Sequence, residues 1–346
     1  MFRTSVKLAL IFVYLVILAG SVVRMTGSGM GCPDWPKCFG HLIPPTERAQ
    51  LEWHPHEEFK KGQVIIKEES LKVAKSDFTT SETYEPQNWA DYTKHDYAEF
   101  NAFHTWVEFV NRLFGMLSGI FVLIMALVGT YCALFKFKNY KKRTIALGWL
   151  SVLLIGLEAW LGAVVVYSLL QPFKITLHMG MSIVIVAVLI YLLQMARKKP
   201  PRVKFDKQFR NLMVLALALT LVQIIMGTRV RQFVDEQVKD LGQFTQGKWL
   251  AAPHFMFYVH RSFSIIILLL NGYLWWKNAQ MNLGHRLMNG VLLLIVLEIF
   301  VGIGLYYFDF PFLSQPLHLL IALLLFAAQF YIVLQAKKSQ ARLITA

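Results

Sequence analysis

Long runs of apolar residues recur along the whole chain, separated by shorter polar segments. Eight of these runs are long enough to cross a bilayer as helices, because about 20 apolar residues span its hydrocarbon core. The predicted spans are residues 8–25, 102–134, 145–167, 172–196, 210–229, 252–276, 287–308 and 313–336. The pattern therefore predicts an all-α membrane protein with eight transmembrane helices in a lipid bilayer.

The apolar runs also carry a repeat of polar and glycine positions. Four such residues recur with one constant spacing of 140 positions: Glu158 and Glu298, Gly162 and Gly302, Tyr167 and Tyr307, His178 and His318. Each half of the chain holds four spans, an even number, so the halves have the same orientation. We predict two parallel-repeat four-helix bundles, an N-terminal half at 1–200 and a C-terminal half at 201–346.

The other spans extend this repeat. Span one closes on Gly20-Ser-Val-Val-Arg24, and span five closes on Gly227-Thr-Arg-Val-Arg231. Span two carries Glu108-Phe-Val-Asn111-Arg112 where span six carries Phe257-Tyr-Val-His260-Arg261. The echo of span one in span five favours a retained first helix over a cleaved signal peptide.

One large polar segment, residues 26–101, separates the first two spans. It opens with Thr26-Gly-Ser-Gly-Met-Gly-Cys-Pro-Asp-Trp-Pro-Lys-Cys38, which is dense in turn residues. We expect an external loop or small cap with short helices rather than a separate catalytic domain. His54 and His56 offer a metal site there, but isolated loop histidines are usually solvated.

Composition and charge indicate how the chain is oriented in the membrane. Only 16% of residues are charged, against about 25% in ordinary soluble domains. The net charge of +14 would be compatible with binding nucleic acid. However, 19 of the 35 lysines and arginines lie on one side of the predicted topology, and that side has a single acidic residue, Asp206. That side comprises both termini and segments 135–144, 197–210 and 277–286. This positive-inside pattern predicts cytoplasmic termini in the inner (plasma) membrane, and no nucleic-acid partner.

Two histidines of the C-terminal half lie at equal depth. His260 and His318 are each about six to eight residues from the external end of a helix, roughly 10 Å below the outer surface. Intramembrane polar residues are costly and usually functional. We therefore favour ligation of one haem iron from both faces over a hydrogen bond between helices.

The N-terminal half offers a single histidine at the equivalent positions. His178 matches His318, whereas Asn111 matches His260, and an amide is a poor iron ligand. An open iron face or haem edge predicts a substrate site. His104, two helical turns before Asn111, either substitutes as a ligand or contacts a haem propionate at the interface.

Three glutamates lie in the apolar zone. Glu108, one turn from Asn111, acts either as a general base or proton donor, or as the i+4 partner of Arg112. Glu158 and Glu298 do not distinguish the halves, so we predict structural bonds to neighbouring helices.

Four arginines lie at the external ends of the spans, against the positive-inside trend: Arg24, Arg112, Arg231 and Arg261. Arginine suits carboxylates, so we predict contacts with haem propionates, with snorkelling to lipid phosphate as the alternative.

Together these features resemble the haem A synthase family over the whole chain. The residues concerned are Gly31-Cys32-Pro-Asp-Trp-Pro-Lys-Cys38, Glu108-x-x-Asn111-Arg112, His178, His260-Arg261 and His318. The resemblance implies haem b held by His260 and His318, and haem O as substrate near Glu108 and His178. It implies an oxidoreductase that converts the C8 methyl group of haem O to the formyl group of haem A. It also implies a disulfide between Cys32 and Cys38.

The implied partners are haem O synthase, haem–copper oxidase assembly, and quinol or another electron donor; a homo-oligomer is left open. The family pattern has histidine where this chain has Asn111. Either His178 suffices, or His104 supplies the missing ligand, or the activity is altered; because Glu108 is retained, we predict an active enzyme.

Two other functions compete with this one. A quinol-linked haem b electron-transfer cytochrome would leave its haem side chains unchanged, and the lack of a second histidine pair argues against a two-haem wire. A transporter would need helices broken near mid-membrane, whereas Pro172, Pro253, Pro311 and Pro316 lie at span ends.

Overall fold

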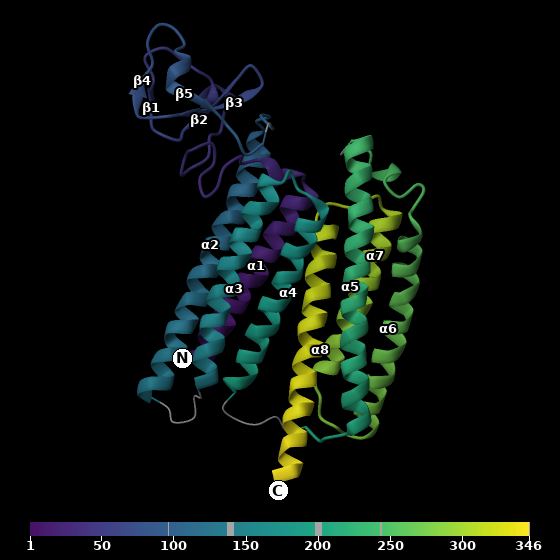
Figure 1. Ribbon diagram of the computed structural model, residues 1–346. Helices are drawn as coiled ribbons and strands as arrows, with labels where there is room; N and C mark the ends of the chain where they lie inside the picture. The colour runs from purple at the N-terminus through teal and green to yellow at the C-terminus, as the bar shows by residue number, and fades with distance from the viewer. Residues whose placement is uncertain (96, 137–141, 198–202, 243, 346) are drawn as a thin grey trace. The chain divides into compact units, whose positions relative to one another are not determined.

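The computed structural model describes residues 1–95, 97–136, 142–197, 203–242 and 244–345, and within these ranges eight long helices contain the apolar runs (Figure 1). They are α1 Phe2–Met25, α2 Ala102–Tyr131, α3 Lys142–Tyr167, α4 Pro172–Met195, α5 Lys207–Leu241, α6 Phe255–Gln280, α7 Leu287–Tyr307 and α8 Ser314–Thr345. Each is long and apolar enough to cross a membrane. The predicted all-α membrane fold is confirmed. The basic segments 135–144 and 197–210 lie partly outside the described residues.

Helix α5 is longer than the predicted span, which ended at residue 229. Its N-terminus is fixed by Asp206, whose Oδ1 accepts a hydrogen bond of 2.6 Å from the backbone N–H of Phe209. At the other end, Val230, Phe233, Val234 and Val238 pack with Trp249, Leu250 and Phe257. This apolar stripe continues the helix after the mean hydropathy has fallen, which explains why the prediction stopped short.

The chain divides into two compact units, and the boundary falls within α1–α4. Unit 1 comprises Met1–Leu18, Ser118–Ile155 and Gly180–Ala346, and unit 2 comprises Ala19–Leu117 and Gly156–Met179. All of α5–α8 therefore belongs to unit 1. Unit 2 holds segment 26–101 together with the adjoining parts of the first four helices.

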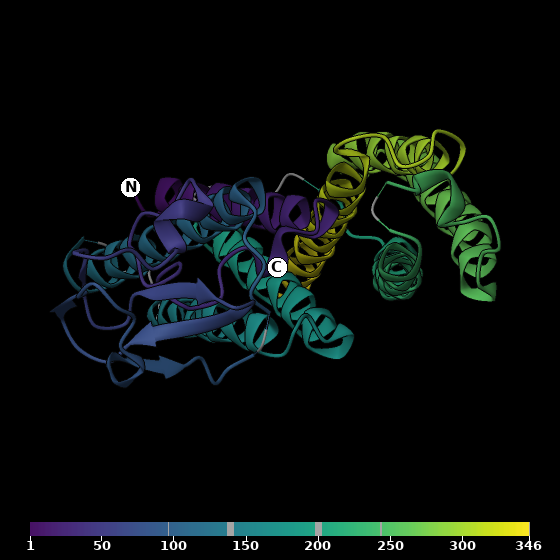
Figure 2. The ribbon, with the colours of Figure 1, turned by 90° about the horizontal axis from the view of Figure 1, so that it is seen from above.

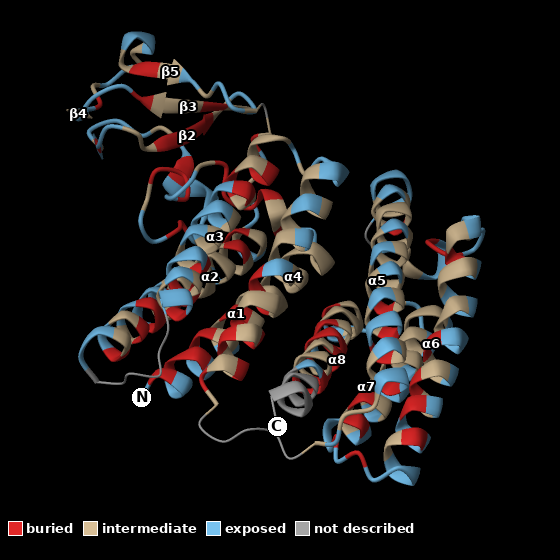
Figure 3. Cartoon of the chain, turned by 60° about the horizontal axis from the view of Figure 1, so that its bottom comes forward, coloured by how far each residue is buried: buried red, intermediate tan, exposed pale blue. Residues whose placement is uncertain are grey.

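In unit 1, α5–α8 close a ring in which α5 and α7 each contact α6 and α8 (Figures 1 and 2). Buried side chains such as Met213, Leu274 and Ile332 fill its core. Large apolar side chains elsewhere on these helices are exposed, including Leu293 and Phe300. Figure 3 colours the exposed stretches of the helices pale blue. Extended exposed apolar surface of this kind is typical of a surface that faces lipid.

In unit 2, segment 26–101 forms a cap with five short strands. They are β1 Glu58–Phe59, β2 Val64–Lys67, β3 Ser70–Ala74, β4 Phe78–Thr79 and β5 Trp89–Asp91. β1 pairs with β4, and β2, β3 and β5 form an antiparallel sheet in that order (Figure 3). The helical turns found here are 3-10 turns at Ser28–Met30, Arg48–Leu51 and Pro86–Asn88.

Two apolar clusters stabilise the cap, and one of them is rich in aromatic side chains. Phe59, Ile65, Ala74 and Trp89 are buried together, with Phe59 and Trp89 in edge-to-face contact at 5.0 Å between ring centroids. The strands were not predicted because each is short and the surrounding sequence is rich in charge.

Candidate functional site

The two histidines of the C-terminal half lie close together within unit 1. His260 lies in the second turn of α6 and His318 in the second turn of α8. Their ring centroids are 6.4 Å apart and the ring planes are inclined by 77°. A metal–imidazole bond is about 2.0 Å, so imidazoles on opposite faces of one iron have ring centres roughly 6 Å apart. The inclination is compatible with this, because each ring can rotate about its own metal–nitrogen bond.

Glycines and a carboxylate surround these rings. A Cβ added to Gly227 of α5 would lie 3.2 Å from Cε1 of His260, and one added to Gly302 of α7 would lie 3.4 Å from Cε1 of His318. Oε1 of Glu298, one turn before Gly302, is 3.4 Å from Nδ1 of His318. Among the described residues, no hydrogen bond reaches the buried Nδ1 atom of either ring. Two imidazoles at this separation, with a glycine against each ring, fit a bound haem.

The same arrangement recurs in unit 2 with one substitution. A Cβ on Gly20 of α1 would lie 3.6 Å from Oδ1 of Asn111, just as the α5 glycine faces the α6 histidine. A Cβ on Gly162 of α3 would lie 3.5 Å from Cε1 of His178, and Oε2 of Glu158 is 3.3 Å from Nδ1 of the same ring. Oδ1 of Asn111 is buried, with no hydrogen-bond partner among the described residues. This half offers one imidazole and one amide.

From the sequence we predicted that Glu158 and Glu298 form structural bonds to neighbouring helices. The structure places each beside a predicted iron ligand on the next helix, α3 to α4 and α7 to α8. The signal that could have found these contacts is the common 140-residue spacing of the glutamates and the histidines.

Glu108 is buried in α2, with 3% of its surface exposed. Its Oε2 accepts a hydrogen bond of 2.8 Å from the backbone N–H of Cys32. Its Oε1 accepts bonds from Nε and Nη2 of Arg112, at 3.1 and 2.5 Å. The pairing with Arg112, one of the two alternatives for this glutamate, is therefore present.

Arg112 joins α2 to the loop that follows α1. Nη1 donates to the carbonyl oxygens of Asp34 and Lys37 at 2.6 and 2.9 Å, and Nη2 donates to that of Cys32 at 3.1 Å. The Cys32–Cys38 disulfide is confirmed, and it closes the loop that contains these three carbonyls. We call residues 32–38 the disulfide loop.

Two further arginines have protein contacts. Nη1 of Arg24 donates to Sδ of Met179 at 3.1 Å. Arg231 forms an ion pair of 2.8 Å with Asp235 and donates to the side-chain oxygen of Gln315.

Arg261 and His104 lie beside aromatic rings. The Arg261 guanidinium is 5.5 Å from the ring centroid of Tyr258, a cation–π contact. The His104 ring lies 5.9 Å from that of Phe103, in the first turn of α2. His104 therefore lies at the N-terminal end of α2, the helix that also carries Asn111.

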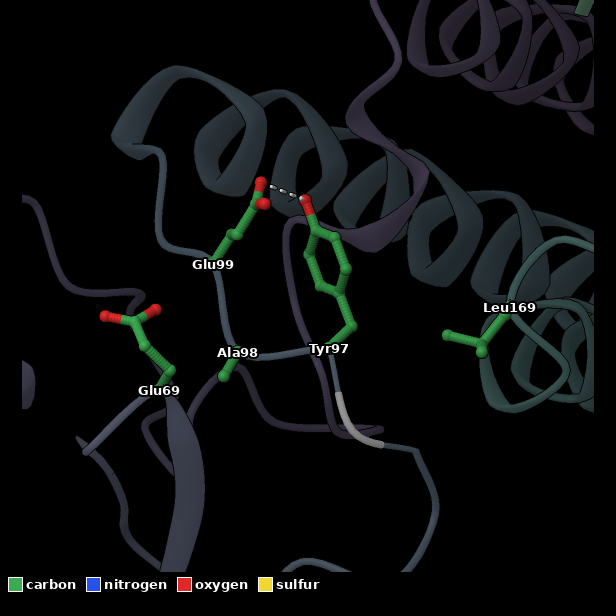
Figure 4. A pocket seen from close by; sticks show the side chains of 5 residues that line it. All are labelled: Glu69, Tyr97, Ala98, Glu99 and Leu169. Carbon is green, nitrogen blue, oxygen red and sulfur yellow. Dashed lines mark hydrogen bonds between the residues drawn. The ribbon is translucent and has the colours of Figure 1, made fainter. Parts of the chain in front are cut away.

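A separate hollow of about 350 Å³ lies elsewhere on unit 2 (Figure 4). It is lined by Glu69, Tyr97, Ala98, Glu99 and Leu169. The Tyr97 hydroxyl donates to Oε2 of Glu99 at 3.2 Å, and burial together with that carboxylate raises the pKa of Tyr97 to about 12. None of the predicted ligands lines it. Among the described residues, no group of three or more His, Cys, Asp or Glu could hold a bare metal ion.

Comparison with known proteins gives consistent matches. The sequence model of the COX15-CtaA family, described as cytochrome oxidase assembly protein, matches residues 3–80 and 66–330. The chain is 27% identical to the haem A synthase of Shewanella oneidensis over 227 residues, covering 64% of this chain and only 54% of that relative. It is 25% identical to the Brucella suis haem A synthase over 327 residues, covering 88% and 81%. It is 24% identical to the Listeria welshimeri haem A synthase over 357 residues, covering 96% and 94%.

Proposed function

Because this chain belongs to the COX15-CtaA family of cytochrome oxidase assembly proteins, we propose that it is a haem A synthase that oxidises the C8 methyl group of haem O to a formyl group. The observation that carries the proposal is the doubled arrangement of glycine, glutamate and histidine, with a histidine pair in one half and a single histidine in the other. One site with two strong ligands and one with an open position suit a resident cofactor and a substrate.

In the C-terminal half, His260 and His318 would hold haem b through its iron. The 6.4 Å between their ring centroids supports this assignment. When bound, haem b supplies one-electron transfer. Arg231 and Arg261 are the proposed contacts of its propionates, since Arg261 directly follows His260 and Arg231 donates to Gln315, three residues before His318.

In the N-terminal half, His178 would bind the iron of haem O, and Asn111 takes the place that His260 has in the other half. An amide binds iron weakly, so one side of the substrate stays accessible. Glu108 is the proposed proton-transferring residue, one helical turn from Asn111 and fixed there by Arg112 and the Cys32 N–H. Arg24, Arg112 and His104 are the proposed substrate contacts towards its propionates.

The cellular context follows the same proposal. Eight apolar helices make this a multi-pass membrane protein. We place it in the inner (plasma) membrane with both termini in the cytoplasm. Haem O synthase would supply its substrate, quinol or another donor would exchange electrons with haem b, and haem–copper oxidase assembly would take up the product.

The decisive experiment is to express the chain with a haem O synthase in a host that lacks haem A. The purified protein is extracted, and its haems are separated by chromatography and identified by mass spectrometry. Haem A, or its hydroxylated precursor, is expected beside haem B. Haem B alone, with haem O demonstrably present in the cells, would instead support the electron-transfer cytochrome.

A further inference from the structure

The contact between glutamate and histidine occurs once in each half, with closely similar geometry. Glu158 Oε2 lies 3.3 Å from Nδ1 of His178, and Glu298 Oε1 lies 3.4 Å from Nδ1 of His318. In both cases a glycine four residues after the glutamate faces Cε1 of the same ring, at 3.5 and 3.4 Å from an added Cβ. The contact thus belongs to the repeat and not to one bundle.

In both contacts the glutamate oxygen lies beside Nδ1 of the imidazole. A neutral imidazole carries one N–H, and an acceptor at Nδ1 favours the tautomer with its proton there, leaving the Nε2 lone pair free. In the described structure neither Nδ1 atom forms a hydrogen bond of regular geometry with any group, the neighbouring glutamate included. Both N···O separations are slightly longer than the usual hydrogen bond, so these are close electrostatic contacts.

Metal-bound histidines commonly donate their second N–H to a carboxylate, which orients the ring and strengthens the nitrogen as a donor. We propose that Glu158 and Glu298 are positioning residues that hold His178 and His318 with Nε2 directed at haem iron. This inference rests on the proposed function, because it takes both histidines as haem ligands. The glutamates act through the histidines and need not touch haem.

The two halves should depend on this support to different degrees. In the C-terminal half, His260 supplies a second nitrogen ligand, and its main-chain carbonyl accepts a bond of 3.0 Å from Gln223. In the N-terminal half, Asn111 replaces that ligand, so His178 alone anchors the substrate iron. Loss of Glu158 should therefore weaken haem binding more than loss of Glu298.

The C-terminal half provides a test that does not involve haem A formation. Purified Glu298→Ala should lose haem b to apomyoglobin about 10- to 100-fold faster than wild type, since support of this kind is worth that much in metal affinity. Its haem b midpoint potential should also shift to a more positive value, because a weaker donor stabilises the oxidised iron less. Glu298→Gln, which keeps the volume and an acceptor oxygen, should restore both quantities in part.

The matched control is Glu236→Gln, which alters an exposed glutamate of α5. It should leave both quantities at the wild-type value. A wild-type rate of haem loss and a wild-type potential in Glu298→Ala would overturn the proposal. Where the alanine variant does not fold, Glu298→Gln carries the test alone, and an unchanged potential there overturns it equally.

The N-terminal half is tested by titrating the purified protein with haem O and following the absorption spectrum. Glu158→Ala should raise the Kd for haem O about 10- to 100-fold, with haem b content and potential unchanged. Equal affinity for haem O in wild type and Glu158→Ala would overturn the role of Glu158. If wild type forms no haem A but Glu298→Ala loses haem b faster and has a more positive potential, the proposed function fails and the positioning role survives. If wild type forms haem A but Glu298→Ala behaves like wild type, only the positioning role is rejected.

Discussion

One residue separates the chemistry of the two halves. Asn111 of α2 and His260 of α6 occupy equivalent places, each facing a glycine of the preceding helix of its half. The side chains differ in donor strength, since an imidazole nitrogen binds iron well and an amide oxygen binds it poorly. On the proposed assignment, the substitution leaves one nitrogen ligand in the N-terminal half where the C-terminal half has two.

Replacing His260 or His318 by alanine should abolish stable binding of haem b, because one nitrogen ligand would remain where two held the iron. The measurement is the haem b content and reduced absorption spectrum of each purified variant. Unchanged haem content and spectrum in both variants would contradict the assignment. His285→Ala, at a buried histidine in the α6–α7 connection, serves as the control for loss of an imidazole.

Asn111→His should give the N-terminal half a second nitrogen ligand opposite His178. The haem O complex is then expected to be six-coordinate and low-spin, with tighter binding than in wild type. Absorption and electron paramagnetic resonance spectra of the haem O complex report this directly. Asn111→Ala, which supplies no ligand, should retain the wild-type spectrum; a wild-type spectrum in Asn111→His would show that residue 111 does not face the iron.

Glu108 has two roles to separate, since it binds the disulfide loop and is the proposed proton-transferring group. Glu108→Gln keeps an oxygen for the Cys32 N–H but removes the carboxylate. Haem A formation should fall about 100-fold or more, within the range of general acid–base catalysis. Haem b content and the protease resistance of the loop should persist. Normal haem A yield in this variant would remove Glu108 from the chemistry.

At the scale of elements, the disulfide loop and α2 form one assembly. Arg112 binds three carbonyls of the loop, and the Thr105 hydroxyl donates to the Gly31 carbonyl at 2.8 Å. Gly31 allows the close approach, because a Cβ there would lie 2.4 Å from the His104 carbonyl oxygen. The loop thereby fixes the buried carboxylate of Glu108 on the same helix.

Gly31→Ala should displace the disulfide loop from α2, since the clash is with backbone atoms that cannot move aside cheaply. The expected cost is about 1–3 kcal/mol, the usual range for overpacking. Limited trypsin digestion at Lys37 should proceed faster than in wild type, and haem A yield should drop. Gly156→Ala, where an added Cβ meets nothing within 4 Å, is the matched control. Equal digestion of Gly31→Ala and wild type would contradict the tight contact.

At the scale of the whole molecule, the sequence predicts those features that lipid itself imposes. Eight helices follow from hydropathy because an unsatisfied backbone cannot cross the bilayer. The extension of α5 to Leu241 was missed, since it depends on packing with Trp249 and Phe257. The bond from the Cys32 N–H to Glu108 was missed for the same reason, as it joins residues 76 positions apart. The repeat located the candidate ligands and carries the glutamates at the same 140-residue spacing, but the 3.3 Å contact of Glu158 with His178 depends on helix packing, which hydropathy does not encode.

Orientation in the membrane is the remaining prediction, and it comes from charge. The side predicted to be cytoplasmic carries 19 of the 35 lysines and arginines and only Asp206 as an acid. Green fluorescent protein fused after Ala346 should fluoresce, because it folds in the cytoplasm. Alkaline phosphatase inserted between Glu68 and Glu69, in the turn from β2 to β3, should be active, because it needs the oxidising exterior.

The reciprocal fusions serve as controls, and both should be silent. The reverse pattern would put the disulfide loop in the reducing cytoplasm, where Cys32 and Cys38 would remain thiols. The loop would then lack the covalent closure that presents its carbonyls to Arg112. Orientation is thus tied to the site: only an external loop can keep the disulfide that holds Glu108 in place.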